Sequence, residues 1–272
     1  RHANWRHVIV NDGGDPAPVE ALLRRHADAY AGRAQVLHHP ASLGMEAASN
    51  AGIAASASRY IAIHDDDDSW HPDFLARTLA AIAAHPTDEC AGAVAWAERV
   101  DERIEGERII EVARESFNGT MQQVQLWRLL AVNQFPPISF VFARAAHDAV
   151  GGFDPTLPVL GDWDFNVRFC ARYEVAVVPA HLAYYHHRVD PAGAYANTVV
   201  GGVALHERWR VWLVNRWLRR DLAAGRIGVG VLAALSADLD VTMHGVQLPR
   251  RVVASLRRRL GGVALRRWLT RR

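Results

Sequence analysis

Four consecutive aspartates stand where an apolar strand ends. Residues 64–70 read HDDDDSW and follow the strand-like run at 60–63. Four adjacent carboxylates repel one another, and a bound divalent cation is the simplest way to make such a cluster favourable. Side chains alternate in an extended segment, so Asp65 and Asp67 face one side and only part of the run can bind one metal. The alternative is a solvated acidic loop that ends in a helix cap.

Two further groups of polar residues come later in the chain. Asp162 begins a helical pattern, and it is either a general base at the mouth of the sheet or only the N-cap of that helix. Asp164 does not do the same job, because residues two apart on a helix do not share a face. His186, His187 and Arg188 follow the last strand. Imidazole can ligate a divalent ion and Arg can hold a phosphate, with a surface or core-packing role as the alternative.

The basic residues and cysteines exclude several kinds of site. All 31 basic residues are arginine. Without lysine, Schiff-base chemistry, a covalent pyridoxal site and the lysine of a phosphate-binding P-loop are excluded. Cys90 and Cys170 are too few for a disulfide framework or a thiolate metal site, and we expect both to be buried free thiols.

Strand-like runs rich in Val, Ile and Ala alternate with helical patterns. This alternation predicts an α/β fold with a mixed, mostly parallel sheet flanked by helices. The predicted strands are 7–11, 34–38, 59–64, 91–98, 138–143 and 175 to about 185, and the predicted helices are about 17–31, 45–56, 72–85, 121–131 and from 162. Asp15 suits the cap of the first helix and Asp68 or Ser69 that of the helix at 72. Residues 99–118 alternate charged and apolar positions, which predicts an exposed hairpin or flap.

The charge is unevenly distributed along the chain. Residues 1–200 hold 16 arginines against 25 acids, whereas residues 201–272 hold 15 arginines against 4 acids. We therefore predict an α/β domain over 1–200 and a helical, arginine-rich extension over 201–272.

The extension ends in a cationic amphipathic pattern. Its basic residues are Arg250, Arg251, Arg257, Arg258, Arg259, Arg266, Arg267, Arg271 and Arg272, which alternate with apolar positions. Such a pattern suits an anionic membrane face, and the alternatives are a solvated helix or one held on the acidic body. Nucleic-acid binding is not expected, since the excess of arginine over acids is confined to one end and the expected active face is acidic. With neither an apolar run of about 18 residues nor a leader, we expect a cytoplasmic protein, at the inner face of the plasma membrane if the tail binds lipid.

Five short motifs occur in order between about residues 4 and 190. They are Asn4-Trp5 with VIVNDGG at 8–14, ASNAGI at 48–53, the aspartate run with Trp70, Pro72 and Phe74, GGFD at 151–154, and DWDF at 162–165 with Arg168. Together they resemble the family 2 glycosyltransferases of the GT-A fold, especially bacterial enzymes of O-antigen and capsule assembly. The resemblance implies a Rossmann-like GT-A domain.

The resemblance also implies roles for individual residues. They are Asp12 at the nucleotide base, Asp65 and Asp66 at the donor with Asp66 nearer the ribose, Asp67 as the principal metal ligand, Asp162 as the base, and His187 or else His186 at the metal or diphosphate. Three positions depart from the family pattern: Asn11 replaces the first Asp of Asp-Asp-Gly-Ser, Ser49 replaces an Arg, and Gly161 replaces the Glu of a Glu-Asp pair. The family's usual opening strand, which helps to hold the nucleotide, is absent before Arg1.

The implied activity is an inverting transfer of a sugar from a nucleotide-diphosphate donor to an acceptor hydroxyl. The resemblance implies a divalent metal, Mn²⁺ or Mg²⁺, a saccharide or lipid-linked saccharide acceptor, and a place in bacterial surface polysaccharide synthesis. Two alternatives stay open. One is a nucleotidyltransferase or phosphohydrolase with an acidic metal cluster, although the Gly-rich loop and Lys of a nucleotidyltransferase are missing. The other is a catalytically silent binding domain of the same fold.

Overall fold

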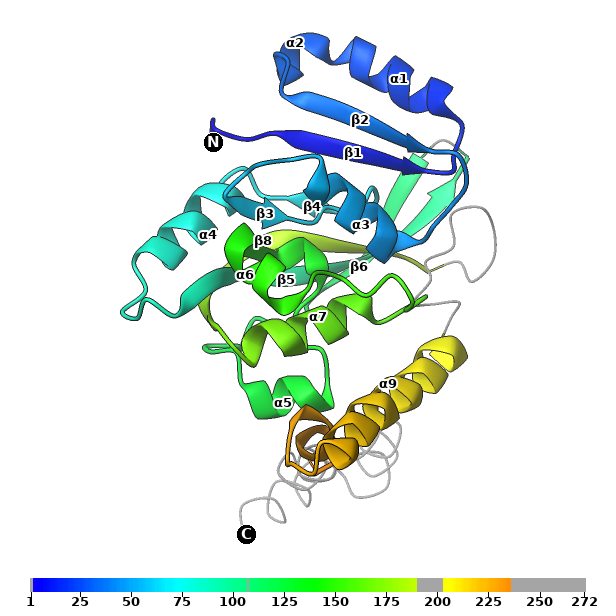
Figure 1. Cartoon of the computed structure of the whole chain (residues 1–272). Coiled ribbons are helices and arrows are strands. Elements are labelled where there is room, and N and C mark those ends of the chain that lie inside the picture. Colours follow the sequence, from blue (N-terminus) through cyan, green and yellow to red (C-terminus); the bar gives the residue numbers. More distant parts are fainter. Residues whose placement is uncertain (1, 107, 190–202, 236–272) are drawn as a thin grey trace, which may run out of the picture.

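The computed structural model describes residues 2–106, 108–189 and 203–235. Two sheets follow one another along the chain (Figure 1). The first pairs β1 (His7–Asp12) with β2 (Ala34–His39), and the second has the order β3-β7-β5-β8-β4, with β6 paired to β5. The strands of the second sheet are β3 (Tyr60–Ala62), β4 (Ser69–Trp70), β5 (Cys90–Glu105), β6 (Arg108–Ser116), β7 (Phe140–Ala143) and β8 (Glu174–Arg188).

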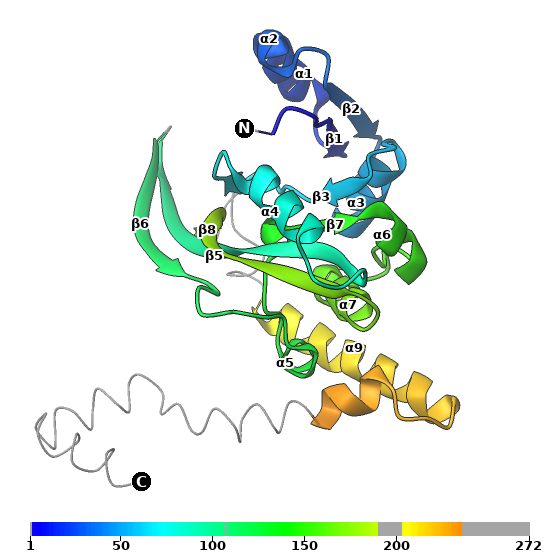
Figure 2. The same cartoon turned by 90° about the vertical axis from the view of Figure 1, so that its left-hand side faces the viewer.

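The predicted mixed α/β architecture is confirmed, but its parallel share is smaller than expected. Of the strand pairs in the described residues, β1–β2 and β5–β8 are parallel. The pairs β3–β7, β4–β8, β5–β6 and β5–β7 are antiparallel. The difference arises because the short strands β4 and β7 and the hairpin strand β6 all run antiparallel to the strands they pair with. The predicted flap is confirmed as the β5–β6 hairpin, whose β6 residues are exposed (Figure 2).

Helices flank both sheets, and the first two of them lie beside the first sheet (Figure 1). They are α1 (Pro16–Arg25), α2 (Ala27–Tyr30), α3 (Met45–Ala54), α4 (Phe74–Ala83), α5 (Leu126–Ala131), α6 (Arg144–Val150), α7 (Gly161–Cys170) and α9 (Val203–Ala223). Asp15 caps α1 as predicted, since its carboxylate accepts a hydrogen bond of 2.9 Å from the Ala17 N–H. The predicted cap for the helix at 72 is wrong. That helix begins at Phe74, and Asp68 accepts a hydrogen bond from the backbone of His186 instead.

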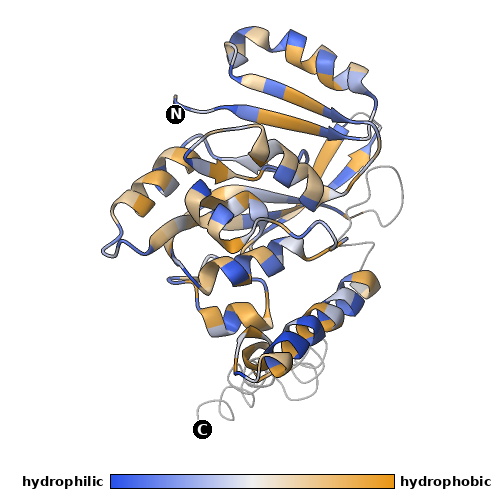
Figure 3. Cartoon of the chain, viewed as in Figure 1, coloured by the Kyte–Doolittle hydropathy of each residue, from blue (hydrophilic) through white to orange (hydrophobic). Residues whose placement is uncertain are grey.

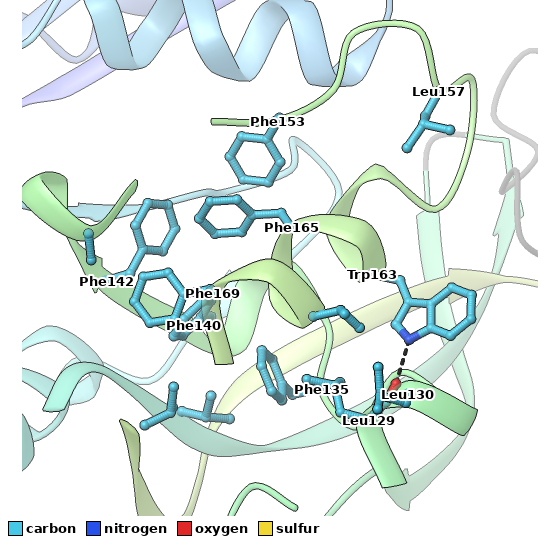
Figure 4. Packing of buried hydrophobic residues seen from close by; sticks show 14 of the residues in the cluster. Leu129, Leu130, Phe135, Phe140, Phe142, Phe153, Leu157, Trp163, Phe165 and Phe169 are labelled. Carbon is cyan, nitrogen blue, oxygen red and sulfur yellow. Dashed lines mark hydrogen bonds between the residues drawn. The ribbon is translucent and has the colours of Figure 1, made fainter. Parts of the chain in front are cut away.

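The apolar core occupies both faces of the second sheet. Helix α4 covers one face, while α5, α6, α7 and α9 gather on the other (Figure 2). On the α7 side, Phe142 of β7 lies 5.0 Å from Phe165 between ring centroids (Figure 4). The Trp163 indole N–H donates a 2.7 Å hydrogen bond to the Leu129 carbonyl, which joins α7 to α5. This packing fixes the first turn of α7, the turn that contains Asp162.

Helix α9 is part of this core, although its sequence is rich in arginine. Leu213 and Trp217 are buried with the α7 side chains, and the Trp217 indole N–H donates to Asp164 Oδ1 at 3.0 Å. Polar and apolar segments alternate along the helix (Figure 3). The predicted boundary at 200/201 and the basic stretch from 250 lie outside the described residues. None of the helices in the described ranges is long and apolar enough to cross a membrane.

Candidate active site

The sheet brings the aspartate run against the end of β8. Strand β4 follows the run directly and pairs with β8 through Ser69 and Tyr184. As a result, the His186 backbone N–H donates to Asp68 Oδ1 at 2.8 Å, and Arg188 Nη1 donates to Asp67 Oδ2 at 3.0 Å. The structure therefore brings the acidic run against His186 and Arg188, two members of the His-His-Arg group that the sequence singled out separately.

Burial and mutual repulsion raise the pKa values of the carboxylates in this loop. Desolvation, reinforced by neighbouring carboxylates, raises the pKa of Asp65 to about 7. Burial raises the pKa of Asp68 to about 8, even though the His186 N–H opposes the rise. The pKa of Asp67 is also raised by burial, against the attraction of Arg188. Asp66 is exposed. A cation placed here would stabilise the ionised carboxylates against both burial and their mutual repulsion.

The two histidines of the group have different surroundings. The ring of His186 is engaged at both nitrogens, with Glu102 Oε1 at 2.6 Å and the Ser69 hydroxyl at 2.8 Å. His187 is buried, and its Nε2 has no hydrogen-bond partner. Burial, helped by the charge of Arg99, lowers the pKa of His187, which keeps the ring neutral and able to ligate a metal. A metal role for His186 stays a prediction, and it would require the ring to give up its contact with either Glu102 or Ser69.

Asp162 lies on the wall of a cavity between the β5–β6 hairpin, β8 and α7. It is the second residue of α7, whose N-cap is Leu160, so it is not the cap of that helix. Asn133 Nδ2 donates to its Oδ2 at 2.7 Å, and burial raises its pKa. The cavity has a volume of about 420 Å³. Its lining is Arg99, Glu115, Ser116, Phe117, Asn133, Phe135, Pro136, Pro137, Asp162, Tyr185 and His187.

One acid in this region was missed by the sequence analysis. Glu46 lies in the first turn of α3 and is 3% exposed. Burial raises its pKa to about 7, and the charges of Asp162 and Asp65 add to the rise. Nothing in the local sequence distinguishes this glutamate, because its neighbours reach it only through folding. Asn133 was missed for the same reason.

Asp12 belongs to a different environment. Its carboxylate accepts hydrogen bonds from the Leu43 and Gly44 N–H groups and the Ser42 hydroxyl, and it contacts His39 Nδ1 at 2.7 Å. These contacts, above all the Leu43 N–H, hold its pKa well below the usual range. In the described residues, Asp12 thus anchors the loop after β2. Its predicted contact with a nucleotide base stays a prediction.

The donors near the aspartate run suit a hard divalent cation that takes few protein ligands. Asp68 Oδ2 is buried without a partner, and carboxylate oxygens are the ligands that Mg²⁺ and Mn²⁺ prefer. Within the described ranges, no three His, Cys, Asp or Glu side chains already converge on one metal position. The fit is therefore to an ion held by one or two carboxylates and completed by phosphate oxygens, as is usual for Mg²⁺. Asp67 and His187 are the candidate ligands.

Comparisons with known proteins point to one family. The model of the family described as glycosyl transferase family 2 matches residues 1–149. The pre-mycofactocin glycosyltransferase of Mycobacterium tuberculosis is 30% identical over 184 residues, which is 64% of this chain and 37% of that protein. The glycosyltransferase YwdF of Bacillus subtilis is 28% identical over 180 residues, 65% of this chain and 62% of that protein. The chain thus spans less than two thirds of either relative.

Among solved structures, similarity extends to a mannosyltransferase from Pyrobaculum calidifontis in complex with GDP-Man and Mn²⁺. That chain is 15% identical, with a TM-score of 0.49 over 97% of this chain and 74% of that one. The family assignment rests on the sequence match, which covers more than half of the 272 residues. The chain belongs to glycosyl transferase family 2.

Proposed function

We propose that this chain transfers a sugar, with inversion, from a nucleotide-diphosphate donor to an acceptor hydroxyl, in a reaction that requires a divalent cation. The observation that carries the proposal is the position of Asp162. This carboxylate borders both the 420 Å³ cavity and the small space beside Asp65 of the acidic loop. A donor held at the acidic loop and an acceptor held in the cavity would meet at this side chain.

In this proposal, Asp162 is the general base. The acceptor oxygen forms a bond to the anomeric carbon of the donor sugar, and its proton passes to Asp162. The bond between that carbon and the diphosphate oxygen breaks, and the nucleoside diphosphate leaves with the electron pair. The raised pKa of Asp162 improves it as a proton acceptor, and a positioned base contributes about 10²–10⁴-fold. Inversion follows because the acceptor approaches from the cavity, opposite the departing diphosphate.

The acidic loop and the end of β8 hold the donor. Asp67, with His187, would bind the cation, which supplies charge to offset that of the departing diphosphate. Arg188 pairs with Asp67 in the structure. If a cation replaced Arg188 as the partner of Asp67, the guanidinium would be free to bind a phosphate of the donor. Asp65 and Asp66 are the proposed contacts to the rest of the donor.

The proposed acceptor is a saccharide, free or lipid-linked, as in bacterial surface polysaccharide synthesis. Aromatic side chains of Phe117, Phe135 and Tyr185 line the cavity beside charged groups of Arg99 and Glu115. Sugars suit such a lining, because their C–H faces pack on aromatic rings while their hydroxyls bind polar groups. Binding of the basic tail to an anionic membrane, near a lipid-linked acceptor, is a further part of this proposal.

The proposal can be tested by thermal unfolding and by release of nucleoside diphosphate. Mn²⁺ with one nucleoside diphosphate should raise the unfolding temperature, since a ligand of the native state alone stabilises it. Asp67→Asn should abolish the rise, whereas Asp88→Asn, at an exposed loop position, should retain it. Asp162→Asn should keep the rise but lose at least about 10²-fold in turnover of the matching sugar nucleotide.

Two outcomes would count against the proposed function. Release of diphosphate from nucleoside triphosphates, in place of nucleoside diphosphate from sugar nucleotides, would favour a nucleotidyltransferase. No shift with any nucleotide and metal, together with no turnover, would favour a silent relative.

A further inference from the structure

Glu46 is a buried carboxylate with an unused oxygen. The residue is 3% exposed, and its Oε1 has no hydrogen-bond partner. Leaving a buried acceptor unsatisfied is costly, and such a group in a folded protein calls for an explanation. The mechanism proposed above does not use it.

The position of Glu46 is tied to the glycine that opens α7. A Cβ added at Gly161 would overlap the Glu46 side chain from its Cγ to its Oε1. The backbone of Gly161 has no positive φ, so the glycine is there for space rather than for an unusual conformation. Helix α3 thus places a carboxylate where the side chain of residue 161 would otherwise start. That location is next to Asp162.

Glu46 borders a space of about the size of one hydroxyl group. Glu46, Asp65 and Asp162 line a cavity of about 10 Å³, together with Met45, Ser49, Ile63, Pro137 and Phe153. A space of roughly this volume accommodates a single water molecule or an equivalent group. Acidic residues from three separate segments therefore border one hydroxyl-sized space, and none of the three has an arginine partner in the described residues.

We propose that Glu46 is a substrate-binding residue of the transfer site, whose free oxygen accepts a hydrogen bond from a sugar hydroxyl entering this space. The inference rests on the proposed function. The hydroxyl belongs to the donor sugar or to the acceptor, and the experiment below distinguishes them. The competing explanation is that Glu46 only fills space at the start of α7.

Because Glu46 occupies the space of a side chain at residue 161, a carboxylate can be supplied there from either residue, and this permits a matched test. Glu46→Ala removes the carboxylate. Glu46→Ala with Gly161→Asn refills the space with an uncharged side chain. Glu46→Ala with Gly161→Asp returns a carboxylate to the same place from α7. Asparagine and aspartate have nearly the same size, so the two double variants differ in charge, and a purely space-filling role predicts equal activity for both.

The expected result is a loss of about 10- to 100-fold in kcat/KM for Glu46→Ala and for the Gly161→Asn double variant, the range that a hydrogen bond to a charged group supplies. The Gly161→Asp double variant should regain at least tenfold over the Gly161→Asn double variant. Equal values of kcat/KM in the two double variants would overturn the proposal. If the Gly161→Asp variant does not fold, Glu46→Gln decides: unchanged kcat/KM overturns the proposal, and a tenfold loss supports it.

A binding measurement separates this inference from the proposed function. Calorimetry compares UDP with UDP-glucose and GDP with GDP-mannose on wild type and Glu46→Gln. A contact to the donor sugar predicts weaker binding of the sugar nucleotide alone, and a contact to the acceptor predicts a raised acceptor KM with donor affinity unchanged. If neither quantity changes, Glu46 does not contact substrate, whether or not Asp162→Asn abolishes turnover. Conversely, a wild type without turnover contradicts the proposed function, while weaker sugar-nucleotide binding by Glu46→Gln still supports the contact.

Discussion

Glu46→Gln should make the free protein more stable at pH 8 than the wild type, by an amount that grows with pH. The side chain is 3% exposed, and its pKa is raised from 4.5 to about 7, chiefly by burial. Below pH 4.5, the carboxyl group is protonated in both the folded and the unfolded chain, so it has no pH-dependent effect. Between pH 4.5 and 7, unfolding releases a proton, and the wild type loses stability as the pH rises.

The magnitude follows from the two pKa values. The difference between 4.5 and about 7 corresponds to about 3 kcal/mol when both states are ionised, near pH 8, and to about 1 kcal/mol at pH 5. Glutamine has nearly the same shape and does not titrate. Any packing or hydrogen-bond difference between the two side chains is the same at every pH, so the change with pH isolates the charge.

Urea unfolding at pH 5, 6.5 and 8, with a chelator to remove divalent cations, measures this difference. The free energy of unfolding of Glu46→Gln, minus that of the wild type, should rise by about 2 kcal/mol from pH 5 to pH 8. Glu89→Gln, at an exposed glutamate, is the matched control and should show no such rise. A difference that stays constant or falls with pH would refute the assignment of Glu46 as a buried acid that ionises at a cost to folding.

Two further predictions concern the core and the proposed base. Trp217→Ala should destabilise the protein by about 3–5 kcal/mol in the same urea assay, because this α9 side chain is 5% exposed. Trp212→Ala is the control on the same helix, and it should cost less than about 1 kcal/mol because its side chain is 40% exposed. Equal costs for the two variants would mean that α9 is not part of the core. Asn133→Leu removes the donor to Asp162 and should raise the pKa of that base, so the acidic limb of the pH–rate profile should move to higher pH, with kcat reduced about tenfold. A change in KM alone would show that Asn133 does not position the base.

Much of the fold was predictable because most helices and strands are long enough for the spacing of their apolar residues to show which they are. The alternation of apolar runs and helical patterns predicted β1, β2 and α3 within two or three residues. The elements that were missed are short: β4 has two residues, and α6 (Arg144–Val150) has seven. Seven residues make two turns of helix, too few for an apolar face to stand out. The strand predicted at 138–143 begins at Phe140, because Pro137 opens a short 3-10 helix instead.

The site was predictable where its residues are adjacent in sequence and hidden where they are not. Density of charge at a strand end predicted a divalent-cation site within residues 65–68, and that site stays a prediction. The pairing of Asp67 with Arg188 could not be predicted, since it depends on β4 lying against β8. Glu46 was also hidden, because its role depends on the space left by Gly161 on another helix. A glycine where the family resemblance implies a carboxylate is the one sequence signal that could have prompted a search for a replacement.

The direction of the pKa change separates the acids that stabilise this fold from those of the proposed site. Contacts with the 39–44 loop lower the pKa of Asp12, so its charge favours the folded state, as expected of a structural acid. The pKa values of Glu46, Asp65, Asp68 and Asp162 are all raised, so their charges oppose folding at neutral pH. Four neighbouring acids whose charges oppose folding are typical of a functional site, because a cation and a sugar hydroxyl would give their charges further partners. In the described residues Asp12 therefore acts as the anchor of the loop after β2, and this contrast is the physical reason to place the proposed donor and acceptor between α3, the acidic loop and α7.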